Sequence, residues 1–421
     1  MVTMPARRAA PDVLVVGAGV AGLVCALDLS RAGLRVALLE ASDGVGGRMR
    51  TDRHDGFTLD RGFQVLSTAY PQVRRRLDRP ALRLRPFTRG VLLHTPHGRL
   101  RLTDPTRDPR RAAALLPGRT AGARDLLALA RLAAADALLP ARRLKTAPER
   151  TTHAALAAAG FTDAFVETFF RPFLAGVFLE DGLVTSSRVF HLVWRSMLRG
   201  TPSLPSAGID AVPRQLAALL PPDTLRLEQP VARLTEEGAG LADGGELPAR
   251  AVVVATDPAT AADLLPTLPV PDCRTVTTYY HAAPRSPLPE PVLLTDTRRR
   301  LLNTCVLSEA VPEYAPPGHS LIATSVLGLD SPGREAALLP VLAEVYGADT
   351  AAWGSVATRE VPGALPAMPP PQPLSRPSPR DVGRGRYVCG DHRATGSVQG
   401  ALASGTRAAR EVLRDLARTD R

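Results

Sequence analysis

Short apolar runs alternate with a helical pattern at the beginning of the chain. Residues 12–16 (DVLVV) are β-branched and almost continuously apolar, which is typical of a strand buried on both faces of a parallel sheet. From Val20 to Arg31 the apolar positions repeat at helical spacing, Gly33 supplies a stop, and residues 34–40 (LRVALLE) indicate the next strand. The pattern predicts a complete β-α-β unit.

Apolar strand patterns of the same kind return much later in the sequence. Residues 224–234 and 250–255 both indicate strands, and the second (RAVVVA) is again continuously apolar after its first residue. The chain closes with a short strand, a polar loop and a helix of about 20 residues. We expect one parallel sheet whose strands come from distant parts of the sequence.

Two insertions interrupt this sheet. The first, from about residue 74 to 204, is rich in Ala, Leu and Arg, and helices are expected near 122–139, 152–159, 162–170 and 186–199. In the second, TVTTYYHA (275–282), VLLTD and SLIATSVLG alternate as strands do, which predicts an antiparallel sheet suited to the wall of a pocket. Prolines in 362–379 exclude a helix or a central strand there, so a surface linker is expected.

The composition excludes several classes of protein. The 421 residues, 45% of them hydrophobic, suffice for two or three domains, and 40 prolines with 34 glycines exclude a helical bundle. The formal charge of +11 comes without a zinc-finger, RRM or basic-zipper motif, so we expect no nucleic-acid partner. Four widely spaced cysteines, none in a CxxC pair, predict neither a metal site nor a disulfide framework.

Nothing in the hydropathy pattern predicts secretion or membrane spanning. The N-terminal residues lack an apolar signal region, and no stretch reaches about 18 uninterrupted apolar residues. We expect a cytoplasmic protein. The arginine-rich helices near 110–145 could touch an anionic membrane peripherally, although the acids among them favour a solvated face. The oligomeric state stays open.

Three glycines and an acid follow the spacing of a dinucleotide-binding turn. Gly17, Gly19 and Gly22 satisfy G-x-G-x-x-G where the first strand meets the helix. Gly17 permits the tight turn, Gly19 lets a pyrophosphate approach the backbone, and Gly22 lets the helix pack on the sheet. The first amides of the helix, at Val20 and Ala21, then face the phosphate charge.

Glu40 closes the second strand of this unit. Its carboxylate can accept hydrogen bonds from a ribose diol and would repel a 2′-phosphate, and Ala41 beside it is included in the expected nucleotide site. This unit alone does not separate NAD from FAD.

A second glycine cluster carries a family resemblance. GVGGRMRT directly after the ribose acid, followed by DRGFQV, is similar to the superfamily of flavin amine oxidases, protoporphyrinogen oxidases and carotenoid (phytoene) desaturases. Taken alone, SDGVGGR is equally compatible with a solvated loop. The resemblance implies FAD as the cofactor. It places two sets of residues near the FAD diphosphate and the flavin ring: Gly46, Gly47 and Arg48, and then Gly62, Phe63 and Gln64.

The end of the chain strengthens the resemblance. CGDHRATGSVQGALASGTRAA looks like the closing motif of the superfamily, in which Gly390 and Asp391 hold the ribityl-phosphate region and a helix begins near Ser397 and Val398 under the flavin pyrimidine. A helix N-terminus there would stabilise negative charge on a reduced flavin. A middle segment is also similar, and it implies that the backbone at Val231 meets the adenine. Here Ala207-Gly208 stands in place of the usual glycine pair.

Together these patterns predict an α/β protein with a Rossmann-like FAD-binding domain, discontinuous in sequence, and an inserted α+β substrate domain of helices and a mainly antiparallel sheet. We assign residues 1–73, 205–265 and 375–421 to the FAD-binding domain, and residues 74–204 and 266–374 to the substrate-binding domain.

The lysine content bears on the reaction. In the amine-oxidising branch of the superfamily, a lysine from the sheet in the later half typically holds a water at flavin N5. This sequence has a single lysine, Lys145, in the helical insertion. The resemblance therefore favours the desaturase-like and protoporphyrinogen-oxidase-like branches.

Five residues are candidates for catalysis: Gln64, Tyr279, His281, His392 and Arg393. His392 is attractive as a base because imidazole titrates near neutrality, although a loop histidine is more often solvated or bonded to backbone. Tyr279 and His281 share one face of a strand, where ordinary sheet packing is the competing interpretation. Phe170, Phe173 and Phe178 can contact substrate or simply pack, and Trp194 is expected in a core.

We therefore expect an FAD-dependent oxidoreductase that carries out a two-electron oxidation of a largely apolar or cyclic small molecule, with hydride transfer to flavin N5. Two other enzymes stay open, a flavin amine oxidase and a flavin-dependent isomerase or mutase without net redox, as does a nonenzymatic FAD-binding protein.

Overall fold

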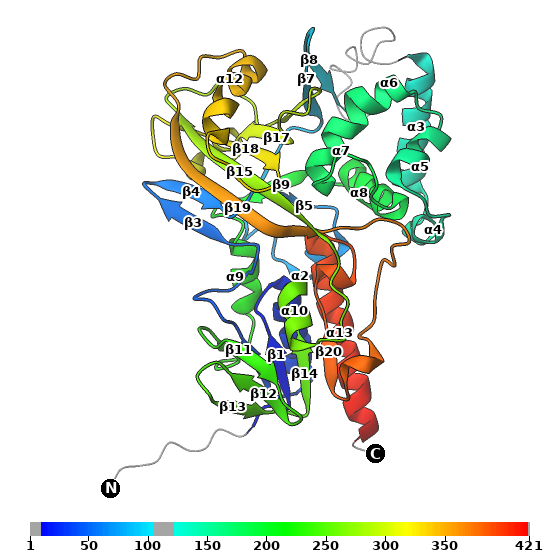
Figure 1. Ribbon diagram of the computed structural model, residues 1–421, viewed down its shortest axis with the longest axis vertical. Helices are drawn as coiled ribbons and strands as arrows, with labels where there is room; N and C mark the ends of the chain where they lie inside the picture. The colour runs from blue at the N-terminus through cyan, green and yellow to red at the C-terminus, as the bar shows by residue number, and fades with distance from the viewer. Residues whose placement is uncertain (1–9, 104–121, 420–421) are drawn as a thin grey trace. The chain divides into compact units, whose positions relative to one another are not determined.

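The chain divides into two compact units, which are shown in the computed structural model of Figure 1. The structure describes residues 10–103 and 122–419. The first unit comprises Met1–Met49, Val212–Pro271 and Ser375–Arg421, and the second comprises Arg50–Ala211 and Asp272–Leu374. These boundaries differ from the expected ones at residues 50–73, 205–211 and 266–271. The functional roles of the two parts remain a prediction.

A five-stranded parallel sheet forms the centre of the first unit, in the order β10-β2-β1-β14-β20. Its strands are β1 (Val13–Val16), β2 (Val36–Leu39), β10 (Leu225–Arg226), β14 (Ala251–Val254) and β20 (Arg386–Val388). Every residue of β1, β2 and β14 is buried, as their unbroken runs of Val, Leu and Ala require of a sheet covered on both faces. The expected parallel sheet from separated segments is confirmed.

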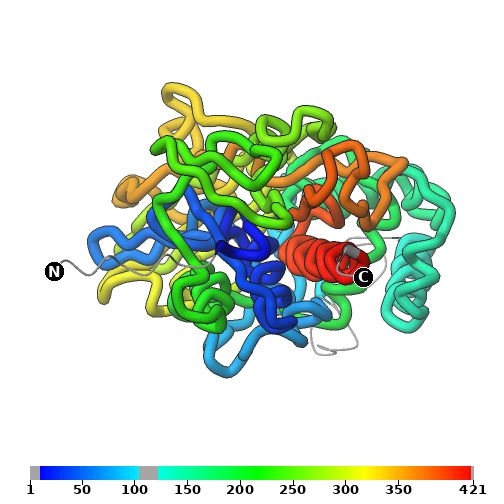
Figure 2. The backbone as a smooth tube through the Cα atoms, turned by 90° about the horizontal axis from the view of Figure 1, so that it is seen from below, coloured from blue at the N-terminus to red at the C-terminus, as the bar shows by residue number. Residues whose placement is uncertain are grey.

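Helix α1 (Val20–Arg31) follows β1 and packs against α13 (Val398–Thr419), as Figure 2 shows. The two backbones approach closely at Gly405, where an added Cβ would lie 2.2 Å from the carbonyl oxygen of Ala21. The first unit also contains α9 (Ala211–Ala217), α10 (Pro258–Leu264), two 3-10 turns (Arg380–Val382 and Asp391–Arg393) and a small antiparallel sheet of β11 (Val231–Leu234), β12 (Gly238–Leu241) and β13 (Glu246–Pro248).

The second unit contains a seven-stranded sheet in the order β19-β15-β18-β17-β16-β7-β8. Its strands are β7 (Val91–Thr95), β8 (Gly98–Leu102), β15 (Cys273–Ala283), β16 (Leu293–Asp296), β17 (Asn303–Val306), β18 (Ser320–Leu327) and β19 (Gly354–Pro366). All neighbouring strands are antiparallel except β16 and β7. The expectation of a mainly antiparallel sheet is confirmed, and the β7–β8 hairpin, from the insertion expected to be helical, adds its outer strands.

The proline-rich segment begins inside the sheet instead of forming only a linker. Residues 362–366 belong to β19, whose partner is β15 alone. An edge strand tolerates proline because one side of its backbone has no strand to bond. The exclusion of a central strand was therefore right, whereas the linker begins later than expected.

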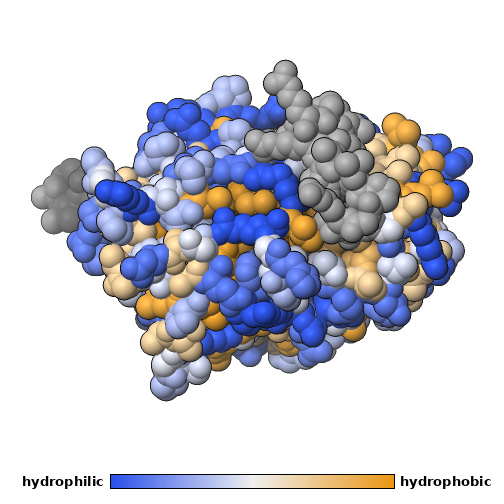
Figure 3. All heavy atoms as spheres, turned by 90° about the horizontal axis from the view of Figure 1, so that it is seen from above, coloured by the Kyte–Doolittle hydropathy of each residue, from blue (hydrophilic) through white to orange (hydrophobic). Residues whose placement is uncertain are grey.

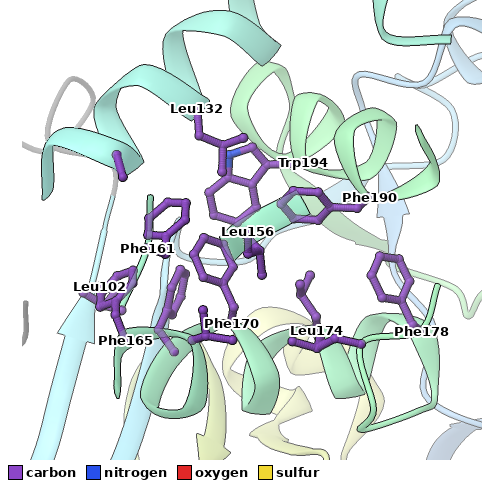
Figure 4. Packing of buried hydrophobic residues seen from close by; sticks show 14 of the residues in the cluster. Leu102, Leu132, Leu156, Phe161, Phe165, Phe170, Leu174, Phe178, Phe190 and Trp194 are labelled. Carbon is purple, nitrogen blue, oxygen red and sulfur yellow. The ribbon is translucent and has the colours of Figure 1, made fainter. Parts of the chain in front are cut away.

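Helices of the second unit enclose an aromatic core, drawn in Figure 4. They are α3 (Ala123–Leu138), α4 (Ala141–Thr146), α5 (Thr152–Ala158), α6 (Asp163–Phe165), a π-helical turn (Val166–Phe170), α7 (Arg171–Phe178) and α8 (Ser187–Arg199). Phe170 and Phe178 are buried in this cluster with Trp194, and Phe173 packs against it. The packing interpretation of these aromatic residues fits the structure, and a contact with substrate stays a prediction.

The remaining elements of the second unit are short apart from one helix. They are the hairpin of β3 (Thr51–His54) and β4 (Phe57–Asp60), the small sheet of β5 (Leu66–Ser67), β9 (Pro202–Pro205) and β6 (Leu84–Pro86), and the helices α2 (Pro71–Arg76), α11 (Leu307–Ala310), the 3-10 turn Pro312–Tyr314 and α12 (Arg334–Tyr346).

Among the described residues, no helix has the length and apolar character needed to cross a membrane. On the face shown in Figure 3, hydrophobic residues form separate areas between hydrophilic ones. Of the arginine-rich stretch 110–145, residues 110–121 lie outside the described residues, and the rest forms α3 and α4.

Candidate functional site

The three glycines of the β1–α1 turn have different surroundings. Gly17 has a φ of +101°, and a Cβ there would lie 3.0 Å from the carbonyl oxygen of Ala255. A Cβ on Gly22 would lie 1.9 Å from the carbonyl oxygen of Gly17, so the helix can pack on the turn only without a side chain. A Cβ on Gly19 would meet no atom within 4 Å. The turn therefore leaves open space at Gly19, where an approaching group can reach the backbone.

The N-terminus of α1 is suited to an anion. Gly19 is the N-cap residue and provides no side-chain hydrogen bond, and the first turn has no acid. The first amides of an α-helix lack intrahelical partners and carry about half a positive charge. A phosphate placed over Gly19 would meet these amides, including those of Val20 and Ala21.

Glu40 fixes the loops on either side of it. Its Oε2 accepts a hydrogen bond from the Ala18 amide at 2.7 Å, and its Oε1 accepts from the amide and hydroxyl of Ser42 at 3.0 and 2.8 Å. The Gln229 amide donates to the Glu40 carbonyl oxygen at 2.9 Å, two residues before Val231 at the start of β11. Glu40, the exposed Ala41 after it and the chain leading to Val231 are thus brought together.

The second glycine cluster lies directly against the first. The Gly46 amide donates to the Ala18 carbonyl oxygen at 2.9 Å, and Gly46 forms a parallel bridge with Gly19. A Cβ on Gly47 would lie 3.6 Å from the Gly19 Cα, and Gly46 and Gly47 both have positive φ. The hairpin of β3 and β4 follows this cluster, and the cluster itself is hydrogen-bonded to the β1–α1 turn.

Arg48 connects this region to the end of the chain. Its Nη2 lies 2.6 Å from Oδ1 of Asp391, which is 7% exposed. The Asp391 Oδ1 also accepts a hydrogen bond from the His392 amide at 3.0 Å, and the Gly390 amide donates to the Ser404 hydroxyl at 3.2 Å. Three segments that are far apart in sequence, with Gly19, Arg48 and Asp391, are therefore neighbours in the first unit.

The imidazole of His392 is buried without a hydrogen bond. It is 4% exposed, and neither ring nitrogen has a partner among the residues that the structure describes. Burial lowers the pKa of His392 to about 4, so the ring is neutral near pH 7. A neutral ring can exchange hydrogen bonds with a bound group, but a pKa this low makes it a weak base.

Arg393 has a structural contact that the sequence did not reveal. Its Nη2 donates to the Pro377 carbonyl oxygen at 2.6 Å, and the Arg376 amide donates to the Arg393 carbonyl oxygen at 2.8 Å. Burial, with a smaller contribution from Arg407, lowers the pKa of Arg393 to about 10. These bonds hold the proline-rich segment, which favours a structural role for Arg393 over the catalytic one expected for it.

Helix α13 begins at Val398, as the closing motif predicts. The Ser397 hydroxyl accepts a hydrogen bond from the Gly400 amide at 3.1 Å, and the first turn contains no acid. The remaining positive end of the helix can stabilise negative charge on a group placed beside it.

In the second unit, the loop from Gly62 to Gln64 lies against one face of the large sheet. The Phe63 amide donates to the Thr278 hydroxyl at 3.3 Å, and a Cβ on Gly62 would lie 3.0 Å from the Val361 side chain. Val361 pairs with Val276, so it shares the face of Val276 and Thr278.

Tyr279 and His281 belong to the opposite face. Tyr279 packs with Val326 and with Leu338 and Leu342 of α12, and its hydroxyl donates to Asp330. His281 Nε2 lies 3.2 Å from Glu335 Oε1, and burial lowers the pKa of His281. The structure does not bring these two residues to the loop of Gly62, Phe63 and Gln64. Thr278 and Tyr280 are the residues directed towards that loop region, and a catalytic role for Tyr279 and His281 stays a prediction.

The cradle around Gly19 fits an FAD molecule. It combines an open backbone surface, uncapped helix amides and an acid, and the same unit holds the unpartnered buried imidazole of His392. Such a set suits phosphate, ribose and a polar ring. No group of three metal-binding side chains is found within the described part of the chain.

Residues 20–413 match the model of one protein family, described as flavin containing amine oxidoreductase. The chain belongs to this family. Membership of the flavin containing amine oxidoreductase family implies a flavin cofactor and a flavin-dependent oxidoreductase, and it confirms the resemblance seen in the sequence.

Curated relatives of the family match over short segments. Hydroxyneurosporene desaturase of Cereibacter sphaeroides is 49% identical over 61 residues, which is 14% of this chain and 12% of that protein. Protoporphyrinogen oxidase 2 of Arabidopsis thaliana is 42% identical over 71 residues (17% and 14%), and L-amino-acid oxidase of Bungarus fasciatus is 46% identical over 77 residues (18% and 15%). The matched segments therefore span less than a sixth of each of these relatives.

Solved structures of the family share the fold along almost the whole chain. A putative protoporphyrinogen oxidase from Exiguobacterium sp. 255-15 matches with a TM-score of 0.70 at 18% identity, over 96% of this chain and 98% of that one. Cyclohexylamine oxidase from Brevibacterium oxydans matches with a TM-score of 0.70 at 19% identity, over 97% and 100%. At this identity the likeness establishes the fold alone.

Proposed function

We propose that the protein binds FAD in the first unit and oxidises a largely apolar or cyclic small molecule by removing two electrons. The observation that supports it most is the meeting of Gly19, Gly47 and Glu40, which leaves an accessible backbone surface beside the N-terminus of α1. A dinucleotide requires this combination for its pyrophosphate and its ribose.

Each part of the cradle has a proposed role toward FAD. The amides of Val20 and Ala21 and the backbone of Gly46 and Gly47 meet the pyrophosphate, and Glu40 accepts hydrogen bonds from the adenosine ribose. The chain at Val231 borders the adenine. Gly390, Asp391, Ser397 and Val398 hold the ribityl-phosphate and pyrimidine end, with Asp391 oriented by Arg48 at 2.6 Å. Phe63 and Gln64 complete the ring site.

The chemistry that FAD would supply when bound is the uptake of a hydride from an activated C–H bond of the substrate. The chain's own contribution is orientation and electrostatics: α13 directs its positive N-terminus to the developing charge, and the neutral His392 imidazole exchanges hydrogen bonds. The low pKa of His392 argues against its service as the base near pH 7.

The lysine content supports a hydrocarbon or ring substrate over an amine. The single lysine of the sequence, Lys145, lies exposed on α4, and the strands of the large sheet contain none. These strands therefore offer no lysine to hold the water that a lysine holds in the amine-oxidising branch.

Anaerobic mixing tests the proposal. The purified protein is expected to be yellow, and a partly saturated polyene or cyclic substrate should bleach the flavin band near about 450 nm, whereas primary amines should not. A colourless protein that does not bind added FAD would rule out the cofactor assignment. Bleaching by amines alone would support an amine oxidase, and turnover only after prior reduction would support an isomerase.

A replacement of His392 tests its assignment as a neutral group. His392→Gln keeps a hydrogen-bonding side chain, so we expect the rate of flavin reduction to change less than about threefold between pH 6 and 8. General-base catalysis would instead appear as a loss of about a hundredfold or more in the variant, together with the loss of a titration in its pH profile.

A further inference from the structure

A pocket in the second unit combines an apolar floor with a cationic rim. The empty space at the pocket and its mouth, open solvent included, is about 420 Å³. The floor is apolar and the rim is charged; the lining comprises Pro172, Ala175, Leu301, Leu302, Val326 and Leu327, and Asp181, Arg299, Arg300 and Arg334. Leu327 pairs with Val276 and so shares the sheet face of Thr278, whereas Val326 packs with Tyr279 on the other face, so the pocket reaches both faces at the end of β18.

The three arginines differ in how far their charge is neutralised. Arg300 is fully engaged, with Nε 2.7 Å from Asp296 and Nη1 2.5 Å from Glu344. Among the described residues Arg299 forms one ion pair, with Asp181, at 3.7 Å between Nη1 and Oδ2, and its charge also contributes to the lowered pKa of Glu167.

Arg334 donates to the carbonyl oxygens of Leu329 and Leu327 at 2.5 and 2.6 Å and forms no ion pair with any residue that the structure describes. The charge of Arg334 contributes to the lowered pKa of Asp330, and Asp181 lies beside Arg299, but both guanidinium groups are less neutralised than that of Arg300, which forms two close ion pairs.

The loops that border the pocket hold strained backbone. Seven non-glycine residues of the described chain have positive φ. Two of them, Leu179 and Leu183 (φ of 51° and 54°), lie in the loop after α7, and Arg299 (φ of 59°) lies in the loop between β16 and β17. Residues with Cβ atoms are disfavoured in this region, and such strain concentrates at binding sites. It is an observation independent of the charges.

We propose that this pocket binds an amphipathic carboxylate, with the carboxylate between Arg299 and Arg334 and the apolar body on the leucine-lined floor. A guanidinium forms paired, charge-assisted hydrogen bonds with a carboxylate, and the apolar side chains that line the pocket, among them Leu302 and Leu327, would contact an alkyl or ring body. The proposal gives the apolar substrate of the proposed function an anionic end, and only that role rests on the proposed function.

Calorimetric titration of the FAD-loaded protein with octanoate tests the pocket, because octanoate is a short, monomeric amphipathic carboxylate. We expect saturable binding, and binding of 1-octanol at least about 10-fold weaker because it lacks the charge. Arg299→Gln and Arg334→Gln should each weaken octanoate binding about 10-fold.

Arg298→Gln is the matched control. Arg298 lies in the same loop as Arg299, its side chain is 49% exposed against 48%, and it does not line the pocket but pairs with Glu344 at 3.0 Å. Its replacement should leave octanoate affinity unchanged. If Arg334→Gln fails to fold because α12 loses the hydrogen bonds of its first residue, the octanoate affinity of Arg299→Gln alone tests the proposal.

Absence of saturable octanoate binding, equal binding of octanol, or equal effects of Arg298→Gln and Arg299→Gln would each overturn the proposal. The flavin spectrum of the same samples separates the two proposals. A protein with bound FAD that ignores octanoate contradicts the pocket assignment alone, whereas a protein that cannot bind FAD contradicts the proposed function.

Discussion

A single buried carboxyl group, that of Asp60, joins three segments of the second unit. Its Oδ1 accepts hydrogen bonds from the Thr51 hydroxyl at 2.6 Å and the Ile209 amide at 2.9 Å, and its Oδ2 accepts from the Tyr314 hydroxyl at 3.3 Å. Burial nevertheless raises the pKa of Asp60 from 3.8 to about 6, because desolvation outweighs these bonds.

The raised pKa of Asp60 predicts a stability that falls with pH. Between about pH 4 and 6 the folded protein keeps the proton that the unfolded chain releases, so the Asp60 contribution is fully present below pH 4 and decreases towards pH 6. At about 1.4 kcal/mol per pH unit the decrease is about 3 kcal/mol. In Asp60→Asn the amide oxygen can accept the same two bonds and the amide nitrogen can donate to Tyr314. In urea unfolding we therefore expect the stability of this variant to lose its dependence on pH between 4 and 6. At pH 7 the variant should be at least as stable as the wild type. An unchanged slope in Asp60→Asn would contradict this account.

Two glycine replacements should separate cofactor binding from folding. Gly19→Ala places a methyl group in open space, so we expect an unchanged melting temperature without FAD and at least about 100-fold weaker FAD binding, because the methyl group blocks the pyrophosphate. Gly22→Ala puts Cβ 1.9 Å from the Gly17 oxygen and should destabilise the fold by several kcal/mol, about 3 or more. Thermal melts with and without FAD measure both. Tight FAD binding by Gly19→Ala would contradict the site.

Among single residues, the sequence could identify the glycines and Glu40, because their roles depend on the space around the backbone and on their spacing along the chain. It could not identify which face of β15 meets the loop of Gly62, Phe63 and Gln64. Tyr279 and Thr278 differ by one position, and only the pairing with β18, β19 and the Gly62 loop decides which of them faces that loop. Nor could the sequence show that the Arg393 side chain donates a hydrogen bond to the Pro377 carbonyl oxygen, since that contact joins a loop to an irregular segment.

At the scale of elements, the close packing of α1 on α13 depends on Gly405. In a helix interior, alanine is normally more stable than glycine by about 1 kcal/mol. Here the Cβ would lie 2.2 Å from the Ala21 carbonyl oxygen, so Gly405→Ala should instead lower the free energy of unfolding by about 1 to 3 kcal/mol. Gly354→Ala, whose Cβ meets no atom within 4 Å, is the control in urea titrations. A stabilised Gly405→Ala protein would refute the close approach.

Two elements, α12 and the β7–β8 hairpin, were not predicted from the sequence, and each has a physical reason. Helix α12 contains Pro340, which normally argues against a helix, and the buried Leu338 and Leu342 on either side of it pack with residues of the sheet. The hairpin β7–β8 was hidden because β7 finds its parallel partner, β16, about 200 positions later in the chain. Local periodicity carries no information on such a pairing, whereas it identified α1, α3 and α8 to within a residue or two.

For the whole molecule, the two units should unfold separately when one is weakened. Each has its own buried cluster, and both tryptophans, Trp194 and Trp353, belong to the second unit. In Gly405→Ala we expect the flavin signal to be lost at lower urea than the tryptophan fluorescence, because the substitution affects the first unit alone. Equal shifts of both transitions would show that the units unfold as one.

The order in which the segments are synthesised follows from this arrangement. The chain passes between the units four times, after residues 49, 211, 271 and 374, so all of the second unit precedes β20, Asp391 and α13 on the ribosome. The second unit can complete its sheet while the edge of β14 still lacks its neighbour. We therefore expect FAD to bind late in the synthesis of this protein, because a nascent chain shortened before β20 would complete the second unit and still lack β20, Asp391 and α13 of the first.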